Sequence, residues 1–425
     1  MNYPDSVQFL YSLGNEIKTA KLGLDRVALL LDALGDPHAR TPFIHVAGTN
    51  GKGSVCAMIE AALRAAGRRT GLYTSPHLAE PTERIRVSGA PVSAARFAAL
   101  FDRVHEAVGR LVDAGALETH TTYFETVTAM ALLEFAEAAC DVVVLEVGLG
   151  GRLDATNVVT PGLCVITPVD FDHEAWLGRS IEAIAGEKAG ILKPGVPAVV
   201  APQRPEAAAV IERRAAEVGA PLTRVADWRI SDVELDARGS GFRLTGARDL
   251  RIACPLAGDH QVQNAATAAV ALAQFGLADT EIEHGIAQAV WPGRLELLAS
   301  GPDVLVDGAH NPAGARALAA YLDRFYSGRD LTLIFGAMRD KALDEIAGTL
   351  FPRARRLILT APHQARAAAP DAILPLISHP DARTAPTLGE AIALARALAP
   401  RDPVVITGSL FLVAEARAAI IGASR

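Results

Sequence analysis

The stretch PFIHVAGTNGKGS at residues 42–54 joins a run of apolar residues to a glycine-rich loop. The run at 42–48 predicts a buried strand, and the residues that follow place apolar side chains at helical spacing. That helical face consists of Val55, Met58, Ile59, Ala62, Leu63 and Ala66, with Gly67 as a candidate C-cap. A glycine-rich loop between a strand and a helix N-terminus lets backbone amides converge on phosphate oxygens. The stretch therefore predicts a phosphate-binding loop.

Two side chains of this loop predict more specific contacts. Lys52 can reach the terminal phosphates of a nucleotide, and the Ser54 hydroxyl can contact magnesium. The spacing differs from the common G-x-x-x-x-G-K-[ST] pattern because Gly53 stands between the lysine and the serine. A glycine-rich turn without a ligand is the alternative, but the strand–loop–helix context favours phosphate binding.

Strands and helices alternate outward from this loop. Further strand candidates are residues 70–75, 141–148, 163–169 and 196–202. Helical patterns lie between them near 94–112, 122–139, 180–192 and 205–218. Continuous apolar strands separated by helices are typical of a parallel sheet covered on both faces. The first part of the chain is thus predicted to be a doubly wound α/β domain.

The alternation of strands and helices is interrupted at residues 228–254. Polar and apolar residues alternate there around a turn at Gly239-Ser240-Gly241, which predicts a small antiparallel β segment. A helical pattern at 260–276 follows, and the proline and glycine of WPGR at 291–294 indicate a linker. Strand–helix alternation restarts with strand candidates at 303–310, 331–338, 355–362 and 403–409. We therefore expect a P-loop ATPase domain at 1–290, a linker at 291–296 and a smaller, Rossmann-like α/β domain at 297–425.

The composition restricts the class of protein. The chain has 425 residues, of which 50% are apolar, and a formal net charge of -7. This excludes overall disorder and argues against a general nucleic-acid binder. Four scattered cysteines without a C-x-x-C pair fit a reduced, cytoplasmic protein. Neither a signal peptide nor a membrane-spanning run is recognisable, so we expect no membrane binding. We also expect a monomer that does not bind nucleic acid.

Ligands gather at the carboxyl ends of the strands in a parallel sheet, and several polar residues follow predicted strands. Glu146 ends one strand, and its carboxylate either holds magnesium or is an ordinary solvated acid. Ser75 and His173 follow two other strands and leave the same two interpretations open. A glycine-rich loop with Arg152 and Asp154 comes directly after Glu146.

Other candidates are ambiguous by themselves. Lys188, in GEKAG, reads most simply as an exposed lysine that balances Glu187. The segment DGAHNP at 307–312 and Ser409 each follow a strand of the second domain, where they either cap a helix or line an interdomain cleft. Arg294, in the linker, either bridges the domains around a nucleotide or is solvated.

Ten motifs occur in one order across residues 45–416: GTNGKGS, LYTSPHL, TYFE, LEVGLGGRLDATN, DHEAWLG, GEKAGILK, GDHQVQNAATAA, WPGRLE, DGAHNP and TGSLFLVAEA. Together they resemble folylpolyglutamate synthase, which in bacteria is often bifunctional with dihydrofolate synthase, within the Mur-ligase superfamily. The resemblance implies an ATP- and Mg²⁺-dependent amide ligase of folate biosynthesis and one-carbon metabolism. ATP would phosphorylate a substrate carboxylate, and the amine of L-glutamate would displace the phosphate.

The resemblance also implies roles for individual residues. The ATP phosphates and the nucleotide are assigned to Asn50, Gly51, Lys52, Gly53, Ser54, Asn264, Arg294 and Asp307. Magnesium is assigned to Ser75, Glu146 and His173, and a second ion to an N6-carboxylated Lys188. Dihydropteroate is assigned to two segments, Thr122, Tyr123, Phe124 and Glu125, and Arg152, Leu153, Asp154 and Ala155. The incoming glutamate is assigned to His310 and Ser409.

Rival interpretations fit less well. A peptidoglycan Mur ligase has a UDP-substrate domain before its loop, and only 47 residues precede Gly48 here. A P-loop GTPase would carry N-K-x-D, and a folate-binding protein without catalysis would be expected to lose Lys52, Glu146 or Lys188. The intact SPHL and TYFE segments favour the bifunctional enzyme, with a dedicated polyglutamylase as the alternative. One departure is Pro81, where many members carry an aromatic residue on the pterin-side loop.

Overall fold

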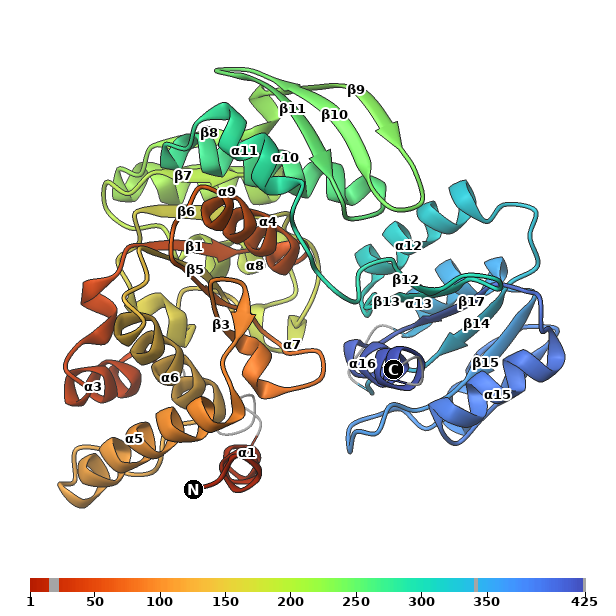
Figure 1. Ribbon diagram of the computed structural model, residues 1–425, viewed down its shortest axis with the longest axis horizontal. Coiled ribbons are helices and arrows are strands. Elements are labelled where there is room, and N and C mark those ends of the chain that lie inside the picture. The colour runs from red at the N-terminus through yellow and green to blue at the C-terminus, as the bar shows by residue number, and fades with distance from the viewer. Residues whose placement is uncertain (15–22, 340–342, 423–425) are drawn as a thin grey trace. The chain divides into compact units, whose positions relative to one another are not determined.

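The computed structural model of the chain describes residues 1–14, 23–339 and 343–422. The chain divides into two compact units, each built on its own mainly parallel sheet (Figure 1). The first unit consists of Met1–Ser231, Arg243–Ile252 and Gln263–Ala289. The second consists of Asp232–Phe242, Ala253–Val262 and Val290–Arg425. The predicted α/β class is confirmed, while the exact domain bounds at 290 and 297 stay a prediction.

The sheet of the first unit has eight strands. In spatial order they are β4 (Ala90–Pro91), β3 (Ile85–Val87), β2 (Thr70–Tyr73), β5 (Val142–Glu146), β1 (Phe43–Ala47), β6 (Leu163–Ile166), β7 (Ala198–Val200) and β8 (Leu222–Arg224). Strands β2, β5, β1, β6, β7 and β8 pair in parallel, while β3 pairs antiparallel with both β2 and β4 at one edge. The five predicted strands are confirmed. The short edge strands β3, β4 and β8 were not predicted because two or three residues show no periodicity.

Helices cover both faces of this sheet. They are α1 (Tyr3–Ser12), α3 (Asp25–Ala33), α4 (Lys52–Ala65), α5 (Ala94–Asp113), α6 (Tyr123–Glu137), α7 (Glu174–Leu177), α8 (Ile181–Ala189), α9 (Pro205–Val218), α10 (Asp259–Phe275) and α11 (Asp279–Ile286). Helices α1, α3, α5 and α6 share one apolar cluster with Phe43 and Tyr73, and α8 and α9 share another with Ala47. Helix α4 packs on β1, β2 and β5 and against α11. Helix α4 lies on the opposite face of the sheet from α6 (Figure 1).

Within the described residues of this half of the chain, short 3-10 turns and a small sheet complete the fold. The turns are η1 (Pro37–Arg40), η2 (Pro81–Arg84), η3 (Ala155–Val158) and η4 (Val225–Asp227). The sheet contains β9 (Arg229–Leu235), β10 (Ser240–Thr245) and β11 (Asp249–Cys254). The predicted turn at Gly239-Ser240-Gly241 is misplaced. The Asp236 carboxylate accepts from the amides of Arg238 (2.6 Å) and Gly239 (2.9 Å), so the turn closes earlier and Ser240 already lies in a strand.

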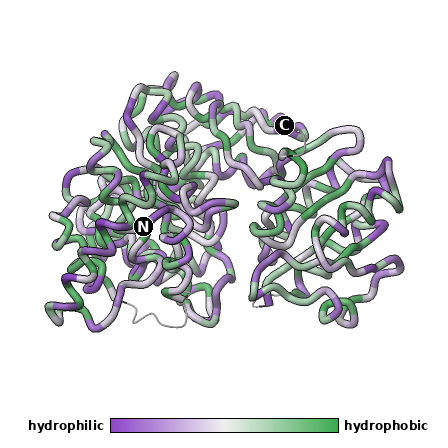
Figure 2. The backbone as a smooth tube through the Cα atoms, turned by 60° about the horizontal axis from the view of Figure 1, so that its bottom comes forward, coloured by the Kyte–Doolittle hydropathy of each residue, from purple (hydrophilic) through white to green (hydrophobic). Residues whose placement is uncertain are grey.

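The second unit has a six-stranded sheet. In spatial order its strands are β12 (Glu296–Ala299), β13 (Val304–Asp307), β17 (Val404–Thr407), β14 (Thr332–Phe335), β15 (Arg356–Leu359) and β16 (Ala382–Thr384). Only β12 pairs antiparallel. Its helices are α12 (Pro312–Phe325), α13 (Leu343–Leu350), α14 (Pro370–Ile373), α15 (Leu388–Leu398) and α16 (Leu410–Ile421), with 3-10 turns η5 (Phe351–Arg353) and η6 (Leu374–Leu376). Apolar stretches, green in Figure 2, run through both units and supply their cores.

Candidate active site

The glycine-rich loop lies between β1 and α4, as predicted. Gly51 adopts a left-handed φ of 85° immediately before the helix. A Cβ on Gly48 would stand 1.9 Å from the Thr167 hydroxyl, so only glycine fits there. Thr49 ties the loop to the chain after β6, because its amide donates to the Pro168 carbonyl at 2.9 Å and its hydroxyl to the Asp170 carbonyl at 2.9 Å. The loop thus has a fixed conformation at the carboxyl edge of the sheet.

Lys52 folds back over this loop. Its Nζ donates to the carbonyl oxygens of Gly48 (3.0 Å) and Thr49 (3.1 Å). Asn264 of α10 packs on the other side, since a Cβ on Gly51 would lie 2.3 Å from its Oδ1. The structure therefore brings Asn264 to the predicted phosphate-binding residues, including Ser54 in the first turn of α4.

Lys188 is buried, which differs from the simplest interpretation of its sequence. The lysine lies on α8 with only 4% of its surface exposed, and its Nζ donates to the Gly48 carbonyl at 2.8 Å. Burial, together with the charge of Lys52, lowers the pKa of Lys188 to about 7. The interpretation of Lys188 as an exposed partner of Glu187 is wrong, because Glu187 pairs instead with Arg152 at 2.8 Å.

Glu146 and Ser75 lie together at the ends of β5 and β2. The Glu146 carboxylate is 4% exposed, and its Oε2 accepts from the Ser75 amide at 3.0 Å. Carboxylate and hydroxyl oxygens are ligands that magnesium prefers, so this pair fits a magnesium ion by its chemistry.

His173 belongs to a separate loop after β6. It precedes α7 with a left-handed φ of 52°, and its ring Nε2 lies 3.8 Å from Asp172 Oδ1. A non-glycine residue in this region of backbone conformation is strained, and such strain is common at functional sites. Within residues 1–14, 23–339 and 343–422, no group of three or more His, Cys, Asp or Glu side chains is arranged to hold a metal.

The two predicted pterin segments meet in the first unit. A Cβ on Gly148 would lie 2.4 Å from the Phe124 ring, so the aromatic side chain packs directly on the glycine-rich loop after Glu146. Asp154 in this loop is 7% exposed and accepts from the Leu149 amide at 2.8 Å. Burial raises the pKa of Asp154, and its hydrogen bonds from Thr156 and Leu149 oppose that rise. Arg152 is 55% exposed and held by Glu187, while Leu153 and Ala155 flank Asp154.

Thr122 and Glu125 form a capping box at the start of α6. The Thr122 hydroxyl accepts from the Glu125 amide, and Glu125 Oε2 accepts from the Thr122 amide at 2.7 Å. Glu125 also lies 3.5 Å from Arg26. These two side chains therefore set the start of the helix that carries Tyr123 and Phe124.

Tyr11 and Arg84 contact Tyr123, and His77 contacts Arg84, yet none of the three has a role assigned from the sequence. Tyr11 of α1 stacks on the Tyr123 ring with centroids 5.7 Å apart, and the Arg84 guanidinium lies 5.1 Å from its centroid. Arg84 Nε donates to His77 Nδ1 at 2.9 Å. The only signal was that His77 and Arg84 lie in or near the SPHL motif. Pro81, the departure from the family pattern, begins η2, a position that suits its fixed φ.

In the second unit, Asp307 ends β13 and is 7% exposed. Its carboxylate accepts from the amides of Leu295 and Ala309, each at 2.9 Å. Burial raises the pKa of Asp307, and the charge of Arg294 opposes that rise. Arg294 also donates to the Gly293 carbonyl at 3.1 Å. Arg294 and Asp307 are thus neighbours in the second unit.

His310 and Ser409 follow adjacent strands of this sheet. Strands β13 and β17 are paired with Asp307 opposite Thr407, so the residues after them leave the same edge. His310 Nδ1 lies 2.8 Å from the Gly308 carbonyl, which makes Nδ1 the protonated nitrogen. Ser409 caps α16, and its hydroxyl accepts from the Phe411 amide at 3.2 Å. Both residues have polar atoms at a strand end.

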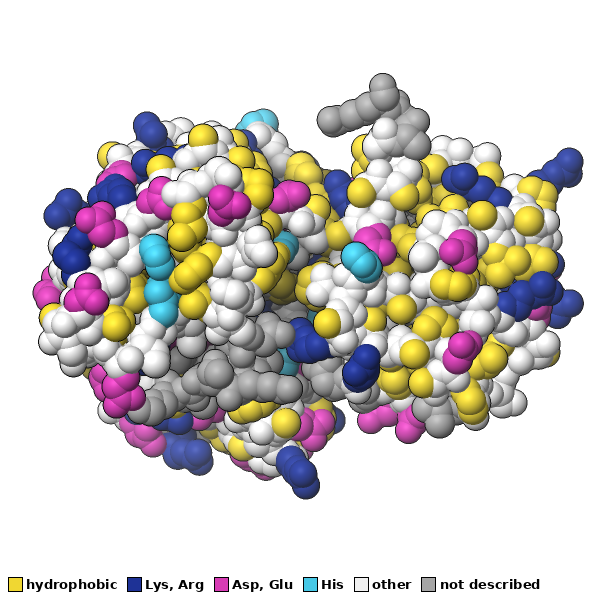
Figure 3. Space-filling view, turned by 90° about the horizontal axis from the view of Figure 1, so that it is seen from below, with side chains coloured by type: hydrophobic (Ala, Val, Ile, Leu, Met, Phe, Trp, Pro, Cys, Tyr) yellow, Lys and Arg dark blue, Asp and Glu magenta, His cyan; other side chains and the backbone are white. Residues whose placement is uncertain are grey.

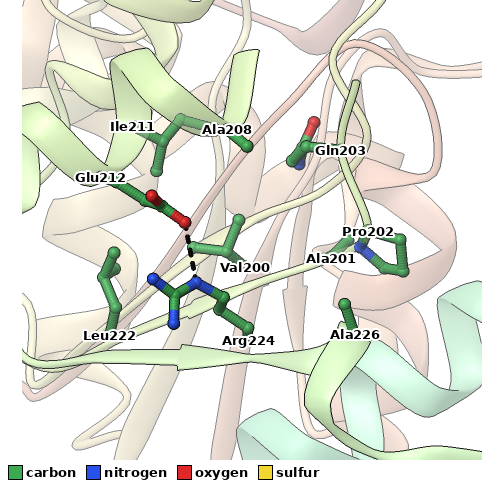
Figure 4. A pocket seen from close by; sticks show the side chains of 10 residues that line it. All are labelled: Val200, Ala201, Pro202, Gln203, Ala208, Ile211, Glu212, Leu222, Arg224 and Ala226. Carbon is green, nitrogen blue, oxygen red and sulfur yellow. Dashed lines mark hydrogen bonds and ion pairs between the residues drawn. The ribbon is translucent and has the colours of Figure 1, made fainter. Parts of the chain in front are cut away.

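A small cavity elsewhere in the first unit does not suit a nucleotide. It lies among β7, β8 and α9 and has a volume of about 50 Å³ (Figure 4). Arg224 Nε donates to Glu212 Oε1 at 2.8 Å beside it. This volume has room for a few water molecules, and no residue of the predicted site lines it.

The surface in Figure 3 carries acidic and basic side chains scattered among one another. On that face, no continuous basic area of the kind that binds a phosphate backbone is visible. Among the residues that the structure describes, no helix combines the length and apolar character needed to cross a membrane.

Comparison with known proteins identifies the family. Residues 46–272 match the Mur ligase middle domain, and residues 293–410 match the Mur ligase glutamate ligase domain. A dihydrofolate synthase/folylpolyglutamate synthase of Mycobacterium tuberculosis is 37% identical over 93% of this chain and 89% of its own length. A probable bifunctional folylpolyglutamate synthase/dihydropteroate synthase of Haloferax volcanii is 38% identical over 98% of this chain, which spans 50% of that longer protein.

Solved structures agree with this match. Folylpolyglutamate synthase of Mycobacterium tuberculosis in complex with ADP superposes with a TM-score of 0.93 at 35% identity and covers 99% of both chains. FolC of E. coli in complex with DHPP and ADP superposes with a TM-score of 0.90 at 34% identity, covering 100% of this chain and 99% of that one. This chain therefore belongs to the Mur ligase family, among its folylpolyglutamate synthase and dihydrofolate synthase members.

Proposed function

We propose that this chain is an ATP-dependent ligase that adds L-glutamate to dihydropteroate and to the γ-carboxyl group of folates. The observation that carries the proposal is the position of Lys52 at the start of α4, where its Nζ lies over the glycine-rich loop and donates to the carbonyls of Gly48 and Thr49. An ammonium group at a helix N-terminus suits a polyphosphate. The family membership and the names of its relatives support the same activity. We expect the enzyme to act as a cytoplasmic monomer.

The chemistry requires the neutralisation of negative charge. A substrate carboxylate attacks the γ-phosphorus of ATP, the bond to the β-phosphate oxygen breaks, and ADP leaves. The glutamate amine then attacks the acyl carbon, inorganic phosphate leaves, and the amine gives up a proton. Residues Asn50 to Ser54 would hold the phosphates, with the Lys52 ammonium offsetting the repulsion between the two anions. Asn264, Arg294 and Asp307 would contact the nucleotide.

Magnesium would supply further charge neutralisation, with Glu146 and Ser75 as its ligands beside the loop and His173 as a third. For Lys188 we propose conversion to an N6-carboxylysine, in which its Nζ forms a bond to the carbon of CO₂ and loses a proton. Only a neutral amine reacts in this way, and a pKa of about 7 leaves about half of the Lys188 amines neutral at neutral pH. The product has two carboxylate oxygens of the type that magnesium prefers.

The pterin substrate would lie against two segments, Thr122 to Glu125 and Arg152 to Ala155. The packing of Phe124 on Gly148 supports a single site for both segments. An aromatic ring beside the buried Asp154 carboxylate offers a stacking surface and a hydrogen-bond acceptor, which are the two features that a pterin ring needs. His310 and Ser409 would hold the incoming glutamate.

The test measures ADP release with ATP, Mg²⁺ and L-glutamate, and offers dihydropteroate and tetrahydrofolate in separate reactions. Mass spectrometry checks each product for one added glutamate. Turnover of both substrates is the expected result. Turnover of tetrahydrofolate alone would identify a dedicated polyglutamylase, and inactivity with both substrates in a folded protein would refute the proposed function.

A further inference from the structure

His45 is a polar residue in the middle of the apolar strand β1. Its side chain is fully buried, between Ile44 and Val46 in a strand that is buried throughout. A buried imidazole needs a hydrogen-bond partner to offset its lost hydration. Its Nε2 lies 2.9 Å from Thr156 Oγ1, a residue 111 positions further along the chain. The predicted phosphate-binding and pterin roles use neither residue.

The direction of this hydrogen bond follows from the next contact. Thr156 Oγ1 lies 2.5 Å from Asp154 Oδ1, and the Thr156 amide donates to the same oxygen at 3.0 Å. A hydroxyl has one proton, and the carboxylate accepts it. The Thr156 oxygen must then accept from His45, which places the His45 proton on Nε2.

The rest of the imidazole agrees with this tautomer. His45 Nδ1 is buried and, among the described residues, has no hydrogen-bond partner, as expected for a nitrogen that carries no proton in an apolar core. Burial lowers the pKa of His45 to about 3, and the charge of Lys193 acts in the same direction. The ring is therefore neutral and has a single proton to donate.

The chain of hydrogen bonds ends at the predicted pterin contact. Asp154 Oδ2 accepts from the Leu149 amide at 2.8 Å, so both carboxylate oxygens have defined donors. Leu149 follows Gly148, on which the Phe124 ring packs. A change at His45 is thus transmitted to the carboxylate and to the loop that faces the aromatic ring.

We infer that His45 is a positioning residue for the pterin end of the substrate: through the Thr156 hydroxyl it fixes the orientation of the Asp154 carboxylate. The inference rests on the proposed function because it takes Asp154 as a pterin contact. The inference assigns a role to a residue of the central strand that does not touch the substrate. It predicts that, of the three substrates, only dihydropteroate has a changed KM.

The kinetic test replaces His45 with leucine, which keeps the volume but removes the donor. In H45L we expect the KM for dihydropteroate to rise about tenfold, because a misoriented Asp154 carboxylate weakens its charged hydrogen bond to the substrate, with the KM for ATP and kcat within about twofold. H45Q places an amide N–H near the position of Nε2 and should restore the KM to within about threefold. A change shared equally by all three substrates would overturn the inference.

A double-mutant cycle separates positioning from packing. T156V removes the hydroxyl through which His45 acts, so H45L/T156V should bind dihydropteroate no more weakly than T156V alone. Additive losses in the double variant would overturn the inference. The matched control is C164A, because Cys164 is the buried residue of β6 that lies opposite His45. This substitution should lower the thermal stability without changing the KM for dihydropteroate.

A spectroscopic measurement on the wild-type protein does not depend on the variants or on turnover. Long-range ¹H–¹⁵N spectra of the histidine rings should show His45 neutral, with its proton on Nε2, down to about pH 5. A proton on Nδ1 would overturn the inference even in a fully active enzyme. A correct tautomer in a protein inactive with both pterin substrates would instead refute the proposed function.

Discussion

The strand ends of the two units use their polar side chains in different ways. In the first unit, Lys52 and Lys188 both donate to the Gly48 carbonyl, and 140 residues separate Lys188 from Gly48. In the second unit, Asn311 and Ser409 each accept from an amide of the helix that they begin. The first arrangement gathers distant charges at one point, whereas the second satisfies the local backbone.

This difference has an energetic consequence. Two basic groups held close together and partly buried repel each other and are poorly hydrated, so they cost stability until an anion binds or Lys188 is carboxylated. A helix cap contributes stability whether or not a ligand is bound. We therefore expect substitutions in the first unit to trade activity against stability, and substitutions in the second to lower stability first.

The largest effect is expected for K52M. Loss of the ammonium removes the charge that would stabilise the transferring phosphoryl group, and we expect kcat to fall about 10³-fold. The assay is ADP release with each pterin substrate at saturating concentration. The matched control is R213A, since Arg213 is a 67% exposed basic residue of α9 in the same unit and should leave kcat unchanged. A loss below tenfold in K52M would remove the contrast between the two units.

The second prediction concerns K188M, which should lose activity about 100-fold and yet unfold at a higher temperature at pH 7. The folded pKa of Lys188 is about 7 and its ordinary value is 10.5, so the unfolded chain binds more protons between these values. The stability cost of the buried amine is thus complete below about pH 7 and fades as the pH rises toward 10.5. Lys52 still donates to Gly48 in the variant, so no carbonyl loses its only partner.

Thermal unfolding of wild type and K188M from pH 6 to pH 10 measures this difference without added bicarbonate. The gap should be widest at pH 6 and close at high pH; a gap that widens with pH would contradict the prediction. With ¹³C-bicarbonate, a carbamate resonance should appear in the wild type and not in K188M. An unchanged spectrum would refute the carboxylation while leaving the unfolding prediction intact.

How much of the fold and of the candidate site could be predicted from the sequence depends on how far apart along the chain the interacting residues lie. The strand–loop–helix arrangement of the glycine-rich loop was predictable because strand, glycines and helix are contiguous. The interpretation of Lys188 as an exposed lysine was wrong, since its helix pattern says nothing about a carbonyl 140 residues away. For the same reason His45 looked like one residue of an apolar strand, with its partner 111 residues ahead. The family motifs gave the site residues their assigned roles, but not the contacts that hold them in place.

The smallest effects, and the sharpest test of the second unit, come from a pair of caps. N311A and S409A each remove a side chain that accepts from a helix amide, and each should lower the free energy of unfolding by about 1 kcal/mol. If Ser409 also holds the incoming glutamate, only S409A should raise the KM for glutamate, by about tenfold for one hydrogen bond to a charged group of the amino acid. Urea unfolding and initial rates at varied glutamate measure the two effects separately.

T387A is the matched control for this pair, because the Thr387 hydroxyl accepts from the Glu390 amide at 3.2 Å at the start of α15 and has no proposed role in catalysis. Equal stability losses in all three variants, with a changed glutamate KM in S409A alone, would separate binding from capping. A glutamate KM that stays constant in S409A would reduce Ser409 to a cap. The second unit would then rely on His310 to hold the amino acid. Its Ser409 would serve only the local backbone, in contrast to the charged residues gathered in the first unit.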